Sequence, residues 1–338
     1  MLNIKILLKR IPSGILTLLG LSILVFGMMR LIPTDPVRAA LGTGASEEAV
    51  QQYRDELGFN EPLPIQYIIW LGDVLQGDLG VSLRTNQPVA EDILSVAPAT
   101  FELMFIALMF AVGVGVPLGM ISGLWKDSLP DHFARFAALS GVSFPRFWLA
   151  IVLQIVFVTW LGLFPLTGRI NGPPPDHITG MYTIDSILTL NATALIDAVW
   201  HLILPAIALG FSTLAQITRM IRSEMIEVQK RAYIEASVAY GLPRDLIAYK
   251  YMLKNSFSSS LTIIGFEIGG MIGGAVLVEL IFNINGIGRY ALFAILNIDY
   301  NAIIGVTLLL GSTYLISNAI VDVLYTSLDP RGADRGVS

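Results

Sequence analysis

The sequence contains no cysteine and only three histidines among its 338 residues. Disulfide bonds and thiolate chemistry are therefore excluded. His132, His177 and His201 lie far apart, without a spacing such as H-E-x-x-H, so a metal site is not expected. A phosphate-binding G-x-x-x-x-G-K-S/T loop is also missing, which excludes nucleotide binding through that motif. An intramembrane protease would need a serine–histidine pair, yet no G-x-S-x-G motif accompanies His201.

Charged residues are also scarce. They make up 14% of the chain, whereas 54% of the residues are hydrophobic and the mean hydropathy is +0.68. Soluble domains carry roughly 25% charged residues. The composition therefore predicts an integral membrane protein.

Six apolar segments are long enough to cross a bilayer, which takes about 20 residues of helix. They predict an all-α membrane protein with six transmembrane helices. A signal peptide is the alternative for the first segment, but its apolar run exceeds the usual core of about 7–15 residues. The predicted spans cover residues 11–32, 98–124, 147–163, 198–217, 261–281 and 302–325. Residues 98–325 are thus predicted to form one transmembrane core, in which a break at Ser143 to Arg146 precedes the third span.

The segment between the first two spans, residues 33–97, has a different composition. It carries ten Asp and Glu residues against three Arg. Ser46 predicts the start of a capped helix that Gly58 would end, while residues 65–75 are apolar but too short to span a bilayer. We predict a small external subdomain. Residues 164–194 and 282–301 are predicted as further external loops, and residues 126–135 as a polar turn on the opposite side.

The distribution of Lys and Arg predicts the orientation. With six spans and an internal N-terminus, fourteen of the 21 Lys and Arg residues fall in cytoplasmic segments and five fall outside. Arg30 and Arg146 lie at span edges. This asymmetry follows the positive-inside rule. The N-terminal residues 1–10 and the tail 326–338 are therefore predicted to be cytoplasmic.

The longest polar and basic segment, residues 219–257, lies between the fourth and fifth spans. It predicts two helices with a break between them. The first would end near Tyr240, because Gly241 suits the left-handed conformation that commonly follows a helix. Pro243 suits the first turn of the next helix. Ala236 and Ser237 are small, so another protein could approach the backbone closely there.

The fifth span contains a carboxylate among regularly spaced glycines. Gly265, Gly269 and Gly273 are four residues apart, as are Gly270 and Gly274. This spacing is typical of close helix contacts in lipid, and it is equally compatible with a face that lines a pathway. Glu267 is costly within a span. It could face a cavity, pair with a cation from another subunit, or be protonated.

Several stretches together resemble one family. Glu235-Ala236-Ser237 followed by Gly241 resembles the cytoplasmic coupling motif of ABC importer membrane subunits. The chain also carries LIPTDP from Leu31, FPRFWL from Phe144, HLILPAIALG from His201 and GAVLVELIFNINGIGR from Gly274. With these stretches it resembles the membrane subunits of dipeptide and oligopeptide ABC importers. That group also serves nickel, glutathione and some oligosaccharides.

The resemblance implies an ABC importer type I permease fold in the cell inner membrane. The chain would form half of a translocation pathway for short peptides, together with a second homologous permease subunit and an external solute-binding protein. Two ABC ATPase subunits would bind ATP and Mg and hydrolyse the ATP, so this chain itself would hold no cofactor and be no enzyme. No nucleic-acid partner is expected. The residues implied in coupling are Tyr233, Glu235, Ala236, Ser237, Gly241 and Leu242, and the candidate pathway residues are Glu267, Gly269, Gly270 and Gly273.

Two alternatives remain open at this point. The same machinery could carry glutathione, nickel or an oligosaccharide. A stand-alone secondary transporter would need inverted repeats and ion-coupling carboxylates near the middle of the membrane. The sequence has no clear internal repeat, and Glu267 is the one carboxylate that qualifies. An uncharged amide is common at this position in the resembled family, so Glu267 also departs from its pattern.

Overall fold

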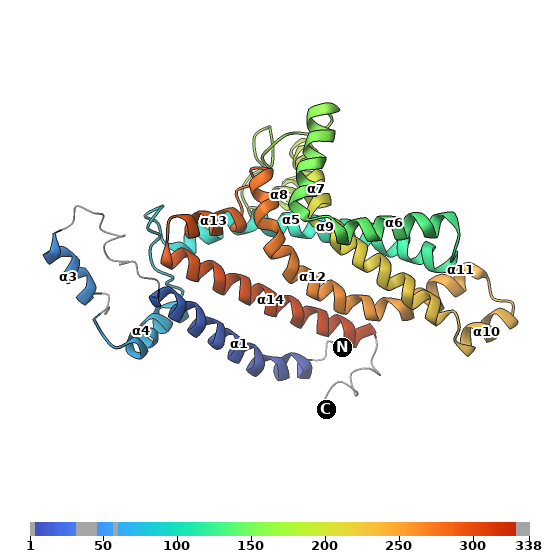
Figure 1. Ribbon diagram of the computed structural model, residues 1–338, viewed down its shortest axis with the longest axis horizontal. Coiled ribbons are helices and arrows are strands. Elements are labelled where there is room, and N and C mark those ends of the chain that lie inside the picture. The colour runs from blue at the N-terminus through green and yellow to red at the C-terminus, as the bar shows by residue number, and fades with distance from the viewer. Residues whose placement is uncertain (1–3, 32–45, 57–59, 329–338) are drawn as a thin grey trace.

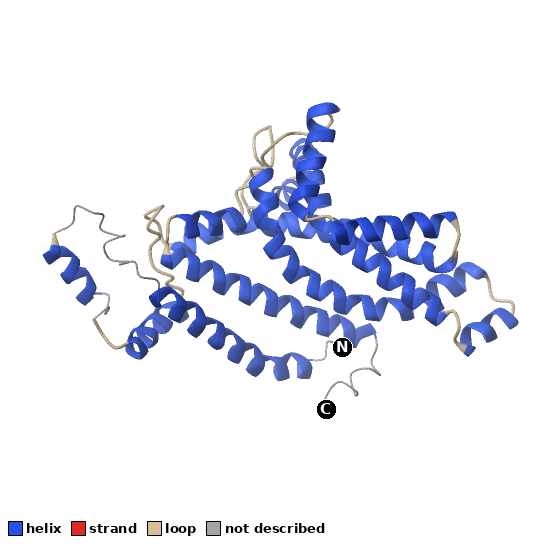
Figure 2. Ribbon diagram, viewed as in Figure 1, coloured by secondary structure: helices blue, strands red, loops and turns tan. Residues whose placement is uncertain are grey.

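The computed structural model describes residues 4–31, 46–56 and 60–328. Within these ranges the regular elements are helices, apart from one isolated β-bridge between Val81 and Pro88 (Figure 2). Long helices form an elongated bundle, with α3 (Glu47–Glu56) and α4 (Leu63–Leu75) at one end and α10 (Ala232–Ala239) at the other (Figure 1). The all-α prediction is confirmed.

Among the described residues, five helices are long and apolar enough to cross a membrane. They are α1 (Ile4–Leu31), α5 (Val89–Leu124), α9 (Ala192–Val228), α12 (Lys254–Ile281) and α14 (Tyr300–Leu328). A sixth candidate is a bent pair, in which α6 (Leu129–Ser143) meets α7 (Arg146–Leu153) and the π-helix η1 (Gln154–Trp160) at 110°. The six predicted spans all correspond to these helices, and the predicted break before the third lies at the bend.

The helices extend beyond the predicted spans. α5 begins at Val89, nine residues before Pro98, because Val89, Ile93 and Val96 are buried against α13 (Ile287–Leu296) and α14. The segment predicted as a polar turn over residues 126–135 is helical from Leu129, so that prediction is wrong for most of its length. Apolarity marks only the membrane-crossing part of a helix, whereas packing against protein continues beyond it.

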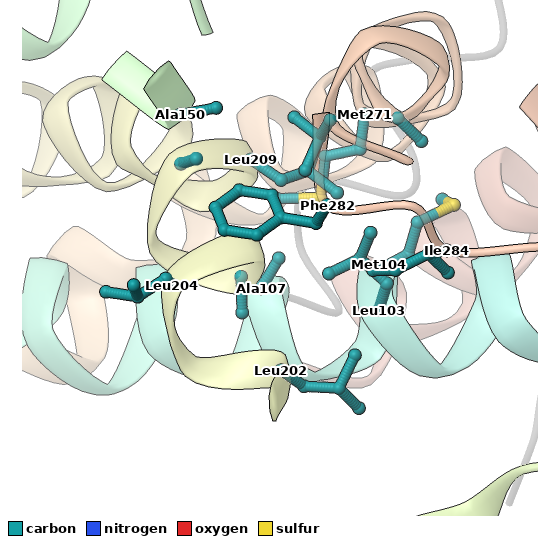
Figure 3. Packing of buried hydrophobic residues seen from close by; sticks show 14 of the residues in the cluster. Leu103, Met104, Ala107, Ala150, Leu202, Leu204, Leu209, Met271, Phe282 and Ile284 are labelled. Carbon is teal, nitrogen blue, oxygen red and sulfur yellow. The ribbon is translucent and has the colours of Figure 1, made fainter. Parts of the chain in front are cut away.

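α9 lies at the centre of the bundle and packs against α5, α6, α7, α8 (Tyr182–Leu188) and α12. Phe282, Leu103, Leu202 and Met271 fill the core where α5, α9 and the end of α12 meet (Figure 3). Along the opposite half of α9, three glycines of α5 face it at four-residue spacing: Gly115, Gly119 and Gly123. A Cβ atom on Gly119 would lie 2.7 Å from Cβ of Ile221, so the two backbones approach more closely than larger residues would allow.

Buried carboxylates fix the loops to the helix ends. Glu279 is fully buried, accepts a hydrogen bond from Thr100 Oγ1 at 2.5 Å and accepts another from the backbone N–H of Arg289 at 3.0 Å. Thr100 in turn accepts from the N–H of Ile287 at 2.7 Å. Glu102 likewise binds the Arg169 guanidinium and the N–H of Thr183. These contacts hold α8 and α13 against the start of α5.

The segment predicted as an external subdomain contains α3, α4 and the bridged turn of residues 81–88. Ser46 Oγ accepts a hydrogen bond from the N–H of Ala49 at 3.2 Å, which confirms the predicted cap. The apolar helix α4 has 13 residues and lies against α1, where Tyr67 and Trp70 contact the ring of Phe26. The predicted helix end at Gly58 and most of the predicted tail lie outside the described residues.

Asp185 organises the second loop and gives it an expected pH dependence. It accepts hydrogen bonds from the N–H groups of Ile178, Thr179 and Gly180 and from the Thr179 hydroxyl. Burial alone would raise the pKa of Asp185, but these hydrogen bonds outweigh it and lower the pKa below its ordinary value. Because the folded pKa is lowered, the stabilisation is complete above the ordinary carboxyl pKa and disappears as the pH falls through the lower folded value.

We therefore expect the loop from 171 to 191 to lose its protection against hydrogen exchange only in acid. Asp185→Asn should lose about 1–3 kcal/mol of local stability already at neutral pH, because its NH2 group would face backbone donors. Amide hydrogen-exchange rates, corrected for the intrinsic effect of pH, measure both the loss of protection in acid and the loss of local stability in the variant. Equal protection of the variant and the unchanged protein at neutral pH would contradict this role of Asp185.

Candidate functional site

The segment between α9 and α12 is a compact helical turn at one end of the molecule (Figure 1). α9 ends at Val228, α10 follows after three residues, and α11 (Arg244–Leu246) continues through the π-helix η2 (Ile247–Leu253) into α12. The sequence predicted one uninterrupted helix up to Tyr240, and that is wrong. The chain is extended at Arg231, which lets α10 turn and bury Ile234 in the same cluster as Val228, Ile247 and Met252.

Only one side of α10 is buried. Ile234 and Ser237 are 4% and 8% exposed, and the Ser237 hydroxyl donates to the carbonyl of Tyr233 at 2.7 Å. The remaining positions are exposed, including Tyr233, Glu235 and Ala236. Val238 and Tyr240 expose 62% and 86% of their surface. α10 thus presents a small-residue and aromatic face to the outside at the end of the bundle.

Gly241 terminates α10 in the predicted conformation. Its φ is +73°. The N–H of Gly241 donates to the carbonyl of Val238 at 3.0 Å, and the N–H of Leu242 donates to the carbonyl of Ser237 at 3.2 Å. This pair of bonds is a Schellman motif, in which a left-handed residue favours glycine. A Cβ at Gly241 would meet no atom within 4 Å. Pro243 is the residue before the next helix rather than its first turn.

Glu267 lies in a polar network within the bundle. Its carboxylate accepts hydrogen bonds from the Arg146 guanidinium at 3.2 Å, from the Thr213 hydroxyl at 2.7 Å and from the Gln216 amide. Arg146 also donates to the Ser212 hydroxyl at 3.0 Å and to the carbonyl of Gly270. The side chains of Arg146 and Glu267 are 19% and 14% exposed. The network therefore joins α7, α9 and α12 at the point where the third span is bent.

The glycines of α12 face different neighbours. A Cβ on Gly269 would lie 2.5 Å from the Tyr314 ring, so this glycine allows close packing of α12 on α14. Gly270 and Gly274 lie beside Arg146, and a Cβ on Gly274 would come within 2.7 Å of its Cδ. Gly273 has no atom within 4 Å of its Cβ position. Among the predicted pathway residues, Gly273 has the least crowded position, while Glu267 and Gly270 belong to the Arg146 network.

Sequence reasoning did not identify Arg146 and its α9 partners as a site. The sequence predicts Arg146 only at the edge of a span, although it follows directly on the break at Pro145. Ser212, Thr213 and Gln216 are uncharged polar residues within a predicted span, and their spacing of three and four places Gln216 on the same helix face as the other two. Polar residues at helical spacing opposite a carboxylate were the available signal.

Comparison with known proteins identifies the family. The profile of the family described as "Binding-protein-dependent transport system inner membrane component" matches residues 115–333. A second profile, described as "Binding-prot-dependent transport system membrane comp, N-term", matches residues 3–104.

Similar proteins match along almost the whole chain. The dipeptide transport system permease protein DppB of Alkalihalophilus pseudofirmus is 40% identical over 327 residues, which cover 96% of this chain and 98% of that protein. The probable D,D-dipeptide transport system permease protein DdpB of Escherichia coli is 38% identical over 329 residues, or 97% of each chain. DppB of Haemophilus influenzae is 39% identical over 329 residues, covering 97% and 98%. This chain belongs to the family of inner membrane components of binding-protein-dependent transport systems.

Proposed function

We propose that the chain is one membrane subunit of an ATP-driven importer of short peptides. The observation that carries this proposal is the similarity over 96–97% of the chain to proteins named as dipeptide transport permeases. The alternative of another solute carried by the same machinery has no comparable support. A stand-alone secondary transporter is also disfavoured, because the family is that of binding-protein-dependent systems.

The proposed partners are a second, similar permease subunit, two ATPase subunits that bind ATP and Mg, and an external binding protein that delivers the peptide. The exposed face of α10 is the proposed contact with an ATPase subunit, through Tyr233, Glu235 and Ala236. Gly241 and Leu242 complete the turn behind it. The buried residues Ile234 and Ser237 fasten this face to the bundle.

The geometry of α10 supports a mechanism of alternating access. α10 follows α9 after three residues, and α11 and η2 lead without interruption into α12. A displacement of α10 would therefore be transmitted to two helices that cross the bundle. When the ATPase subunits close on ATP, α9 and α12 would move in concert. The proposed pathway beside Glu267 and Gly273 would then open to the opposite side of the membrane.

The proposed orientation, with both termini in the cytoplasm, can be tested with single cysteines, since the chain has none of its own. Gln87 and Asp176 are exposed in the proposed external segments, and Gln229 is exposed beside α10. In intact cells, Gln87→Cys and Asp176→Cys should react with an impermeant maleimide, while Gln229→Cys should react only after permeabilisation. Labelling of Gln229→Cys in intact cells would overturn the orientation.

The substrate class is tested by reconstituting the complex with its own binding protein. ATP hydrolysis and uptake should be stimulated by dipeptides or tripeptides, and much less by glutathione, nickel or oligosaccharides. Stimulation by one of the latter, with no response to peptides, would leave the importer assignment intact but refute the peptide substrate.

A further inference from the structure

A basic pocket lies between α6 and α9, and its lining includes no residue of α10 or of the Glu267 network. Its volume is about 360 Å³, and the residues that line it include Arg135 of α6 and Arg219 and Arg222 of α9. The hydroxyl-bearing residue Ser223 lies beside them. No carboxylate is among the lining residues within the described part of the chain. The pocket therefore presents positive charge and hydrogen-bond donors.

The charge of these arginines is only partly neutralised. Arg222 donates to both oxygens of the buried Asp131, at 2.7 and 2.9 Å. Arg135 shares the same carboxylate at 3.6 Å and lies 3.9 Å from Asp127, which is largely exposed. Arg219 is exposed, and its side chain forms no hydrogen bond or ion pair with any residue that the structure describes. The buried carboxylate of Asp131 is thus shared by Arg135 and Arg222. The guanidinium of the third arginine, Arg219, keeps all its hydrogen-bond donors available.

The arginines of the pocket lie close to the ends of their helices. Arg135 is six residues from the start of α6, and Arg222 is six residues from the end of α9. At 1.5 Å per residue, both lie about 9 Å from the helix ends. The headgroup layer on each side of a bilayer is roughly 5–8 Å thick. α6 begins and α9 ends at the end of the bundle that carries α10 (Figure 1), so in the proposed orientation these arginines lie near the cytoplasmic surface of the membrane.

Part of the pocket wall, on α6, is apolar. Leu139 and Val142 lie further along α6, towards its bend, and expose 69% and 55% of their surface. An inorganic ion would use only the basic part of such a pocket. A phospholipid would use both parts, because its phosphate would meet the arginines while an acyl chain lay along α6.

We infer that this pocket binds a phosphate group, and that an anionic phospholipid such as phosphatidylglycerol supplies it. Guanidinium groups bind phosphate oxygens through paired hydrogen bonds. Basic pockets between transmembrane helices near one membrane surface are suited to anionic headgroups. Lipid bound there would fasten α6 to α9 next to the helix end from which α10 follows.

The test uses the intact complex, purified in mild detergent and analysed by native mass spectrometry for retained phosphatidylglycerol. Arg219→Gln should lower retention about fivefold, the effect of one arginine at a membrane surface. The Arg219 side chain has no partner among the described residues, so the variant should fold. Arg222 is unsuitable, because its loss would remove the two hydrogen bonds that it donates to the buried Asp131. Arg244→Gln is the matched control: this exposed arginine at the same end of the molecule also has no partner among the described residues.

Thermal unfolding in nanodiscs distinguishes the two sources of phosphate. Phosphatidylglycerol should stabilise the unchanged complex and the Arg244→Gln complex, but not the Arg219→Gln complex. Stabilisation by inorganic phosphate in neutral lipid, equally dependent on Arg219, would assign the site to a free anion instead. The inference would be overturned if neither the retention of phosphatidylglycerol nor the thermal stabilisation depended on Arg219. It would also be overturned if Ser223→Cys formed a crosslink to a partner subunit, because that subunit would then occupy the pocket instead of a lipid.

Discussion

Gly241→Asp is expected to reduce peptide uptake about tenfold or more while the protein reaches the membrane in normal amounts. The left-handed backbone at Gly241 costs an L-residue roughly 1–2 kcal/mol, and Asp tolerates it better than most. The new side chain would extend into open space at the proposed docking face rather than into the bundle. None of the apolar helices changes, so insertion should proceed. A charge that an interface buries without a partner costs several kcal/mol of binding free energy.

Gly241→Asn is the matched control for this variant. Asn has nearly the same shape, also tolerates the left-handed conformation and carries no charge. It should retain most of the uptake, whereas Ala236→Arg on the exposed side of α10 should lose it. Gln229→Arg, which adds the same cation outside α10, should behave normally. Uptake, membrane levels and ATPase retention during purification measure all four variants. Normal uptake in both Gly241→Asp and Ala236→Arg would refute the coupling role.

Arg146→Gln is expected to destabilise the protein strongly. It would leave the half-buried Glu267 carboxylate without a cation, and removing one partner of a fully buried pair costs about 3–5 kcal/mol, which is the upper limit here. We expect a clear fall in the melting temperature of the purified complex and in the amount recovered from membranes. Glu267→Gln should cost less, because Arg146 keeps the Ser212 hydroxyl and the carbonyl of Gly270 as acceptors.

The double variant Arg146→Gln with Glu267→Gln tests the pair itself. Removing both charges should recover part of the stability lost in Arg146→Gln, and the non-additivity gives the coupling energy between contacting residues. Glu267→Gln alone should lower transport modestly and leave the order of preferred peptides unchanged. The reason is that the spans contain no dense set of polar or charged residues that could select among peptides. Strictly additive losses would show that the two charges do not act as a pair. A reversed order of peptides would show that this subunit selects its substrate.

The sequence was sufficient for the spans and for the turn at Gly241. An apolar run of about 20 residues has few structural alternatives to a helix in a bilayer. A glycine shortly before a proline at the end of a helical stretch likewise has few alternatives to a turn. The extents of α5, α6 and α9 were not predictable in this way. Their additional turns are stabilised by contacts with distant parts of the chain, such as Val89 and Ile93 against α13 and α14. Tertiary packing of that kind leaves no local pattern.

The site was only partly predictable, for the same reason. Glu267 was recognised from the cost of a charge within a span, but its partners come from two other helices. Arg146 is 121 residues away in the chain, so only the packing of α7 and α12 on α9 brings the two together. The break between α9 and α10 was missed because residues 219–240 have no proline or glycine to mark it. It follows from the burial of Ile234.

We expect this chain to transport peptide only as part of an ATP-driven complex. The most direct measurement is uptake of a labelled dipeptide by proteoliposomes that contain the chain purified together with its genetic neighbours. We predict that an ATPase copurifies, and that uptake requires enclosed ATP and added binding protein and persists when ionophores collapse all ion gradients. Uptake by the chain alone, driven by an ion gradient and independent of ATP, would contradict the account.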